Sequence, residues 1–276
     1  MNLLPSSRWC YQPDTRPSLN DYATTITDID LPRRSDIEDQ LKHAQRRLWA
    51  SKKTGLVLIF QGLDASGKDG CIRAVCAGMD PMGYDAVGFG VPSELEKSHD
   101  FLWRVQEHLP ACGFITLMNR SYYEAVLAER ALAEEQGQSE GFDFGRRCRS
   151  IRDFESHLAQ HGTRVLKFWL HVGKAEQADR LRTRLTDPER HWKFHPSDLQ
   201  TWEHRQRYLG YASEALEQTH CAESPWYVIA ADDKKVARKL VCQRVIEVMQ
   251  IIAGDYPTED AETLNRYLSE LGDGGQ

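Results

Sequence analysis

Short runs of consecutive apolar residues recur along the chain, separated by stretches in which apolar positions follow helical spacing. The continuous runs are LVLIF (56–60), AVGFGV (86–91), FITLM (114–118), VLKFWLHV (165–172) and WYVIAA (226–231). The stretches with helical periodicity are 67–79, 98–109, 121–135, 144–161, 175–186, 198–219 and 233–253. Apolar strands that alternate with helices are typical of a parallel sheet covered on both faces. The pattern therefore predicts a doubly wound α/β fold with about five central strands.

The two ends of the chain lack this alternation. Residues 1–34 are rich in proline, and we expect an irregular arm that lies over the surface. Ser35 is expected to cap the helix that opens the main domain, 35–253. Residues 254–276 form an acidic tail. Within the main domain, the helical, basic and aromatic stretch at about 174–224 is the candidate for a lid.

The composition is that of an ordinary globular protein, with 276 residues, 41% hydrophobic and 28% charged, and a net charge of −6. No apolar run comes close to the ~18 residues that cross a bilayer, and the N-terminus lacks the pattern of a secretory signal. We therefore expect a cytoplasmic protein with no membrane partner, and the acidic balance argues against a nucleic-acid partner. The seven cysteines are scattered and include no CxxC pair, which argues against a disulfide framework and a zinc ribbon.

One segment departs from this acidic balance. Between Arg164 and Arg207, ten Lys and Arg residues stand against six Asp and Glu, a net charge of +4. A basic segment in an acidic chain indicates one localised anion site. Arg180 and Arg184 would share a helix face, and with Lys193 they could bind phosphate from a mobile lid that excludes water. A solvated basic helix face is the alternative.

The first apolar run leads directly into GLDASGK (62–68), which has the pattern GxxxxGK, and a helical stretch follows. In this context the backbone N–H groups of the loop and the helix N-terminus surround a phosphate, and Lys68 adds a full positive charge. A chance match is the alternative, but the strand before the loop and the helix after it argue against one. The loop residues that we expect to contact phosphate or nucleotide are Gly62, Ala65, Ser66, Gly67, Asp69 and Gly70.

Two carboxylates stand in this loop region. Asp69 occupies the place where a Ser or Thr hydroxyl normally binds Mg²⁺, and Asp64 lies inside the loop, where it would repel phosphate. A divalent cation offsets this repulsion, so Asp64 could hold Mg²⁺ or accept a proton from an attacking phosphate. Asp69 has an equally good explanation as an acid favoured in the first turn of a helix.

The third apolar run ends in Asn119-Arg120. Because the carboxyl ends of parallel strands share one edge of the sheet, both side chains should face the phosphate loop. Asn119 could bind Mg²⁺ through its carbonyl oxygen, and Arg120 could bind the transferring phosphoryl group. Ser121 and Glu124 are explained separately, as a capping box of the next helix.

Together these motifs resemble the polyphosphate kinase 2 family. The matching stretches are QGLDASGKDG (61–70), HDFLWR (99–104), NRSYYE (119–124), DPERHWKF (187–194) and SPWYVIAADDKKVAR (224–238), in the family's order. The resemblance implies a P-loop kinase-like three-layer sandwich with a helical lid. It also implies reversible phosphoryl transfer, dependent on Mg²⁺ or Mn²⁺, between inorganic polyphosphate and AMP, ADP, GMP or GDP. A homo-oligomer, either a dimer or a tetramer, is a further implication.

By the same resemblance, the family's essential residues fall on the motifs already described. The implied catalytic residues are Asp64, Lys68, Arg120 and Arg180, with Arg184 close by, and the loop acid Asp64 takes part in metal binding. From the residues themselves we add Lys193 as a phosphate-binding side chain and Asn119 as a metal ligand beside Asp64. Some members carry Asp where this chain has Asn119. Glu129 stands where some members have an apolar residue and others an acid, which leaves the choice between AMP and ADP open.

Two other functions stay open beside this one. An ATP-dependent nucleoside or nucleotide kinase could use the same fold and would ignore polyphosphate. A non-catalytic sensor would bind phosphate or nucleotide without forming a product. Its support is the pair Asn119 and Asp69, which both depart from the usual Mg²⁺ ligands.

Overall fold

A computed structural model describes residues 9–27 and 29–272. At its centre lies one sheet with the strand order β2-β3-β1-β4-β5, in which all neighbours are parallel. The strands are β1 (Gly55–Gln61), β2 (Tyr84–Gly88), β3 (Ile115–Asn119), β4 (Thr163–His171) and β5 (Trp226–Ala230). From β1 the chain passes to the edge strand β2 and returns to β3 beside β1, and it then adds β4 and β5 on the other side of β1. Because the two halves lie on opposite sides of β1, the doubly wound prediction is confirmed.

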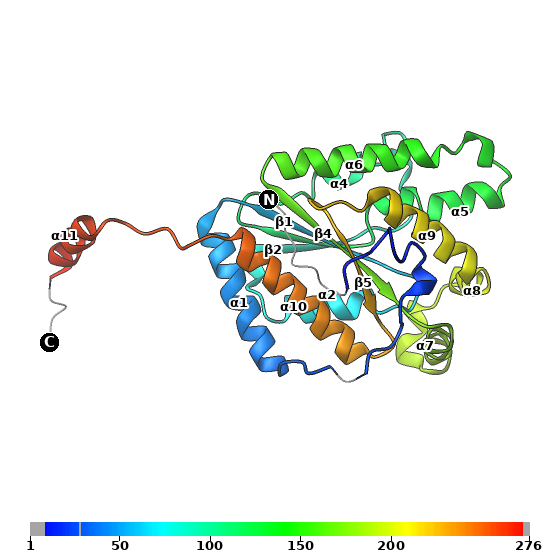
Figure 1. Cartoon of the computed structure of the whole chain (residues 1–276), viewed down its shortest axis with the longest axis horizontal. Helices are drawn as coiled ribbons and strands as arrows, with labels where there is room; N and C mark the ends of the chain where they lie inside the picture. The colour runs from blue at the N-terminus through cyan, green and yellow to red at the C-terminus, as the bar shows by residue number, and fades with distance from the viewer. Residues whose placement is uncertain (1–8, 28, 273–276) are drawn as a thin grey trace.

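Helices cover both faces of this sheet, which makes three layers (Figure 1). The principal helices are α1 (Arg34–Ser51), α2 (Lys68–Cys76), α6 (Phe144–Gln160), α9 (Arg205–Thr219) and α10 (Lys234–Ile252). On one face, α1, α2 and α10 pack against Leu56, Leu58 and Phe60 of β1. On the other, α6 and α9 pack against Val57 and Ile59. Because alternate residues of β1 enter opposite cores, the whole strand is apolar.

Several element ends differ from the predictions. Strand β2 begins before the predicted run and ends at Gly88, where its pairing partner β3 ends at Asn119. Three predicted helices are shorter or divided: 98–109 contains α4 (Trp103–Gln106), preceded by α3 (Glu94–Lys97); 121–135 contains the 3-10 helix η3 (Tyr122–Ala125) and α5 (Ala128–Glu135); 198–219 contains α8 (Pro196–Glu203) and α9. Edge strands and short connecting helices bury little apolar surface, so their periodicity defines their ends poorly.

The cap predicted at Ser35 is wrong. Helix α1 begins at Arg34, its N-cap position is Arg33, and no side-chain cap bond is present there. Ser35 already lies in the first helical turn, and its hydroxyl donates to Asp36 Oδ1 at 3.1 Å. The chain therefore enters the helix before the residue that was expected to cap it.

The described part of the N-terminal segment lies along the outer edge of β5. The Tyr11 N–H donates to the Trp226 carbonyl oxygen at 2.9 Å, and the Val228 N–H donates to the Trp9 carbonyl oxygen at 2.8 Å. Residues 1–8 and 28 of the predicted arm, and 273–276 of the predicted tail, lie outside the described residues. These contacts cover a sheet edge that would otherwise expose unpaired backbone groups.

The segment predicted as a lid begins just beyond the carboxyl end of β4. It consists of α7 (Lys174–Thr186), the 3-10 helix η5 (Pro188–Lys193), α8 and α9. The last helix of the described residues is α11 (Ala261–Leu271), which stands clear of the domain (Figure 1). Of the helices in the described residues, none has the length and apolar character of a membrane span.

Candidate active site at the carboxyl edge of the sheet

The loop between β1 and α2 adopts backbone angles that its glycines permit. Gly62 has φ 147° and Gly67 has φ 107°, both in the region that disfavours side chains. A Cβ atom at Gly62 would also lie 2.7 Å from the Leu170 carbonyl oxygen. Ala65 is held at φ 63° despite its Cβ, a cost that persists where the surrounding structure fixes the backbone. The loop is therefore tightly curled in front of the N-terminus of α2.

Lys68 closes this loop on itself. Its Nζ donates to the carbonyl oxygens of Gly62 at 2.8 Å and Leu63 at 3.3 Å. Burial lowers the pKa of Lys68, and the negative charge of Asp64 partly opposes that shift. A phosphate oxygen forms a stronger, charge-assisted bond with an ammonium group than a neutral carbonyl does. The ammonium group is thus placed where an entering phosphate would attract it.

A second set of charges faces the loop from the end of β3. Arg120 Nη2 donates to Asp64 Oδ1 at 2.9 Å, and Arg120 Nη1 lies 3.9 Å from Glu124 Oε2. The Glu124 carboxylate raises the pKa of Arg120. Burial raises the pKa of Glu124, although Arg120 and Lys68 oppose the shift. Arg120 has φ 64°, an uncommon value for a residue with a side chain and one that often marks a functional site.

A third set connects the loop helix to the lid segment. Asn119 Nδ2 donates to Asp69 Oδ1 at 2.8 Å, and Lys193 Nζ lies 3.2 Å from Asp69 Oδ2. Burial by itself would raise the pKa of Asp69, but these hydrogen bonds and the Lys193 charge lower it instead. The predicted residues Asp69, Asn119 and Lys193 are thus brought together by the fold.

The two predicted lid arginines have different surroundings. Arg180 is buried; its Nη1 donates to the loop carbonyl oxygens of Ala65 and Ser66, both at 2.9 Å, and its Nη2 donates to two carbonyl oxygens just after β5. It therefore ties the phosphate loop to the end of β5. Arg184 Nη1 donates to Asp198 Oδ2 at 2.8 Å and so joins α7 to α8. In the described structure, the ion pairs of Asp64 and Asp69 are with Arg120 and Lys193, and not with Arg180 or Arg184.

The oxygen donors around the loop suit a hard divalent cation that is bound together with phosphate. The described residues contain no group of three or more His, Cys, Asp or Glu side chains placed to hold a metal by themselves. Mg²⁺ needs no such cage, because it usually takes one or two carboxylates and completes its shell with water and substrate phosphate. Asp64, Asp69 and the Asn119 amide oxygen are donors of that kind. Ser66 Oγ is buried in the loop and has no hydrogen-bond partner in the described structure, as expected for a group that contacts a ligand.

The contacts of two side chains at this site, Glu124 and Gln177, were not predicted from the sequence. The capping box predicted for Ser121 and Glu124 does not form. Ser121 Oγ caps η3 by accepting from the Tyr123 N–H at 3.2 Å, whereas the Glu124 carboxylate lies toward Arg120. The four-residue spacing between Arg120 and Glu124 was the available signal. Gln177 of α7 is buried and donates to the Asp64 carbonyl oxygen at 3.0 Å, a contact that no motif indicated.

The negative charge of Glu129 is balanced by an arginine of the same chain. Its carboxylate pairs with Arg147 Nη1 of α6. Arg147 also donates to the Ala125 carbonyl oxygen at 2.8 Å and lies over the Phe142 ring, 4.5 Å from its centroid. The acid at this position is therefore part of an ion pair on the helices that follow β3.

The comparisons with known proteins agree with this geometry. The profile of Polyphosphate kinase 2 matches residues 28–256. The chain is 41% identical over 227 residues to the ADP-polyphosphate phosphotransferase of Rhodopseudomonas palustris, which covers 79% of this chain and 78% of that protein. It is 39% identical over 220 residues to the AMP/ADP-polyphosphate phosphotransferase of Meiothermus ruber, with 79% and 80% covered.

A solved structure extends the match to three dimensions. The crystal structure of polyphosphate kinase 2 from Arthrobacter aurescens TC1 superimposes with a TM-score of 0.80 and 33% identity, covering 92% of this chain and 93% of that one. This similarity confirms the P-loop kinase-like fold. With the profile match over most of its length and the phosphate loop in place, the chain belongs to the polyphosphate kinase 2 family.

Proposed function

We propose that the protein catalyses reversible, Mg²⁺-dependent transfer of a phosphoryl group between inorganic polyphosphate and a nucleoside mono- or diphosphate. The observation that carries this proposal is the pairing of Lys193 and Arg120 with the loop carboxylates Asp69 and Asp64, beside Lys68. Substrate phosphates would replace the carboxylates as partners of the cations. A divalent cation would in turn neutralise the carboxylates, so that the charges stay balanced throughout.

A polymeric donor needs positive charge beyond the loop itself. Lys234, at the start of α10, has its pKa lowered by burial and by the charges of Arg180, Arg190 and Arg238, while Glu176 opposes the shift. The Arg238 guanidinium also borders the loop helix, since a Cβ on Gly70 would lie 3.0 Å from it. Polyphosphate would pass along this basic surface toward the loop.

The roles of the side chains follow from their positions. Lys68 and Arg120 would bind the transferring phosphoryl group and stabilise its developing charge. Asp64 and Asn119 would hold Mg²⁺ or Mn²⁺, which neutralises charge on the donor and acceptor phosphates. Arg180 would act through the loop, because its bonds to two loop carbonyl oxygens keep the loop N–H groups turned toward the substrate. Phosphoryl transfer needs mainly such positioning and charge stabilisation.

The acceptor is the finer part of the proposal. The relative from Meiothermus ruber is named for both AMP and ADP, and the one from Rhodopseudomonas palustris for ADP alone. We include AMP, ADP, GMP and GDP as acceptors of this chain. The Glu129–Arg147 pair, on the helices after β3, is where we expect a change in side chain to alter the preference.

The test is an incubation of the purified protein with Mg²⁺, long-chain polyphosphate and, separately, each of these four nucleotides. Products are separated by anion-exchange chromatography, with a chelator control and tubes in which ATP is the donor. We expect product only where polyphosphate and the metal ion are both present. Transfer from ATP that ignores polyphosphate would indicate a nucleotide kinase instead. Binding of polyphosphate without any product would indicate a sensor.

A further inference from the structure

Helix α11 carries an apolar face that no other part of the described structure covers. Leu264, Tyr267, Leu268 and Leu271 recur at helical spacing and so share one side of the helix. None of the residues in α11 is buried, and Leu268 and Leu271 are 64% and 80% exposed. A helix this short is marginal in water by itself. We therefore expect the apolar side of α11 to pack against another surface.

The charge of this segment restricts what the partner can be. Residues 255–271 contain five acids, Asp255, Glu259, Asp260, Glu262 and Glu270, and one basic residue, Arg266. Helices that lie on anionic lipid surfaces carry Lys and Arg on their polar face, so this composition argues against a membrane. The matching surface must combine an apolar floor with positive charge.

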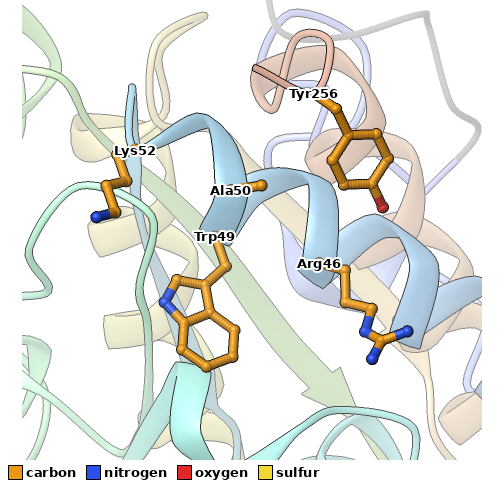
Figure 2. A pocket seen from close by; sticks show the side chains of 5 residues that line it. All are labelled: Arg46, Trp49, Ala50, Lys52 and Tyr256. Atoms are coloured by element: carbon orange, nitrogen blue, oxygen red, sulfur yellow. The ribbon is translucent and has the colours of Figure 1, made fainter. Parts of the chain in front are cut away.

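Such a surface lies on this same chain, at the C-terminal end of α1. A hollow of about 420 Å³ is lined by Arg46, Trp49, Ala50, Lys52 and Tyr256 (Figure 2). In Figure 2 the indole ring of Trp49 lies between the side chains of Arg46 and Lys52. Residues 40–54 carry five Lys or Arg residues and no Asp or Glu. The hollow, which we call the α1 hollow, thus matches α11 in both apolar character and charge.

We propose that two copies of this chain associate by exchanging α11 reciprocally, so that each helix occupies the α1 hollow of the other copy. The tail starts beside the hollow, since Arg47 donates to the Gly254 carbonyl oxygen at 2.6 Å and Tyr256 forms one wall. From there the connection leads α11 away from its own domain (Figure 1). The helix and the hollow of one copy are therefore both open to those of another. Two-fold symmetry then repeats the contact and closes the assembly.

The first test measures the mass of the full chain in solution, by light scattering or sedimentation over a wide range of concentrations. We expect the wild type to associate and Leu268→Glu to raise the dissociation constant by at least about tenfold, the effect of losing a buried apolar anchor. Leu95→Glu on α3 is the matched control, since Leu95 is 62% exposed in the structure and lies far from the tail in sequence. A wild type that is monomeric at every concentration, or an oligomer that Leu268→Glu leaves unchanged, would overturn the proposal.

A second test separates exchange between copies from folding back within one copy. One variant carries Arg46→Glu and Lys52→Glu in the α1 hollow, and the other carries Leu264→Glu and Leu268→Glu in α11. Each alone should associate much more weakly than the wild type, and an equal mixture should recover part of the association. The mixed pair keeps one of the two contacts, because the first variant retains an intact helix and the second an intact hollow. A mixture that associates no more strongly than either variant alone contradicts exchange. These readouts do not involve activity, so they stand or fall independently of the proposed function.

Discussion

Two clusters of charged and polar side chains in this molecule are built in opposite ways. The core cluster joins β4, α6 and η3 through Lys167, Glu155, Tyr122, Tyr123 and Ser224. Its Lys167 and Glu155 side chains are 0% and 1% exposed, with Nζ and Oε2 2.7 Å apart. The phosphate-loop cluster comprises Lys68, Asp64, Asp69, Asn119, Arg120, Glu124 and Lys193. Its two loop carboxylates are 17% and 49% exposed.

The two regions also differ in whether their buried polar groups all have hydrogen-bond partners. Glu155 accepts from both tyrosine hydroxyls, from Ser224 and from Lys167, while Lys167 also donates to the Thr219 carbonyl oxygen at 2.8 Å. A buried ion pair survives only when its remaining donors and acceptors are satisfied in this way. In the loop, by contrast, Ser66 Oγ has no partner within the described residues, and Arg120 keeps an uncommon backbone conformation.

This difference separates what holds the fold from what meets a ligand. The core cluster has no free position for a substrate, whereas the pairs of the phosphate-loop cluster can exchange their partners for phosphate and metal. The two are connected, because Tyr122 and Tyr123 follow directly after the Asn119-Arg120-Ser121 segment. By fixing both tyrosine hydroxyls, Glu155 anchors the loop that presents Arg120 to the site.

The largest effect is expected from breaking the core cluster. Glu155→Ala would leave the Lys167 ammonium and two tyrosine hydroxyls buried without their acceptor, so we expect the free energy of unfolding to fall by about 3–5 kcal/mol. Urea denaturation of the wild type and the variant measures this change. The double variant Glu155→Leu with Lys167→Met is the control, because removing both charges should recover the part of the loss that comes from the unpaired ammonium. A fall below about 1 kcal/mol in the single variant would contradict the role given to this cluster.

A loss of function without a loss of stability is expected from the phosphate-loop cluster. Lys68→Ala removes the ammonium that would bind the transferring group, so kcat with polyphosphate should fall about 10²- to 10³-fold. The unfolding midpoint in urea should hold, because a buried ammonium bonded only to carbonyl oxygens contributes little net stability. Lys97→Ala is the matched control, as Lys97 is exposed and pairs with Glu94 on α3. Retention of near-full activity by Lys68→Ala would remove this residue from the site.

The elements of the fold were predictable to different degrees, for a physical reason. A central parallel strand such as β1 is buried on both faces, so it stands out in the sequence as an unbroken apolar run. The single helix predicted over 121–135 failed because the backbone around Arg120 is set by distant contacts. The Arg120 N–H donates to the Phe60 carbonyl oxygen at 3.0 Å, and its side chain pairs with Asp64. No local pattern encodes these contacts.

The residues of the site also differ in how far the sequence could predict them. Lys68 and Arg120 could be placed at one edge because adjacent parallel strands end together. The partners of Arg180 depend on how α7 docks against the loop, and four residues of spacing on a helix do not reveal which carbonyl oxygens a guanidinium will meet. Gln177 and Glu124 were missed for that reason as well: the residue types are common, and only their tertiary neighbours distinguish them.

Acid should lower the free energy of unfolding because of His171, which lies on β4 together with Lys167. Burial, followed by the charge of Arg205, lowers the pKa of His171 to about 4. The unfolded chain takes up this proton near pH 6.5, so stability is fully present above that pH and is lost as the pH falls toward 4. The contribution of this group is at most about 3 kcal/mol.

The measurement is urea unfolding across this pH window for the wild type and His171→Gln. We expect a shallower dependence on pH in the variant, whatever its absolute stability. His43→Gln is the control, since His43 is exposed on α1. Parallel pH curves for wild type and His171→Gln would show that another group takes up the proton.

The smallest effect is expected where the phosphate-loop cluster meets the metal. Asn119 Nδ2 donates to Asp69 Oδ1 in the structure, and Asn119→Asp would replace that donor by a second carboxylate. Two adjacent carboxylates repel each other unless a cation lies between them, so the variant should bind Mg²⁺ more tightly. We expect the Mg²⁺ concentration for half-maximal activity to fall by up to about tenfold, which is about 1.4 kcal/mol, while kcat at saturating Mg²⁺ changes less. Asn20→Asp on the N-terminal segment adds the same charge at an exposed position and should leave the Mg²⁺ dependence unchanged. A half-maximal Mg²⁺ concentration that stays constant or rises in Asn119→Asp would place the metal away from the end of β3. The phosphate-loop cluster would then bind phosphate but not the metal at that position.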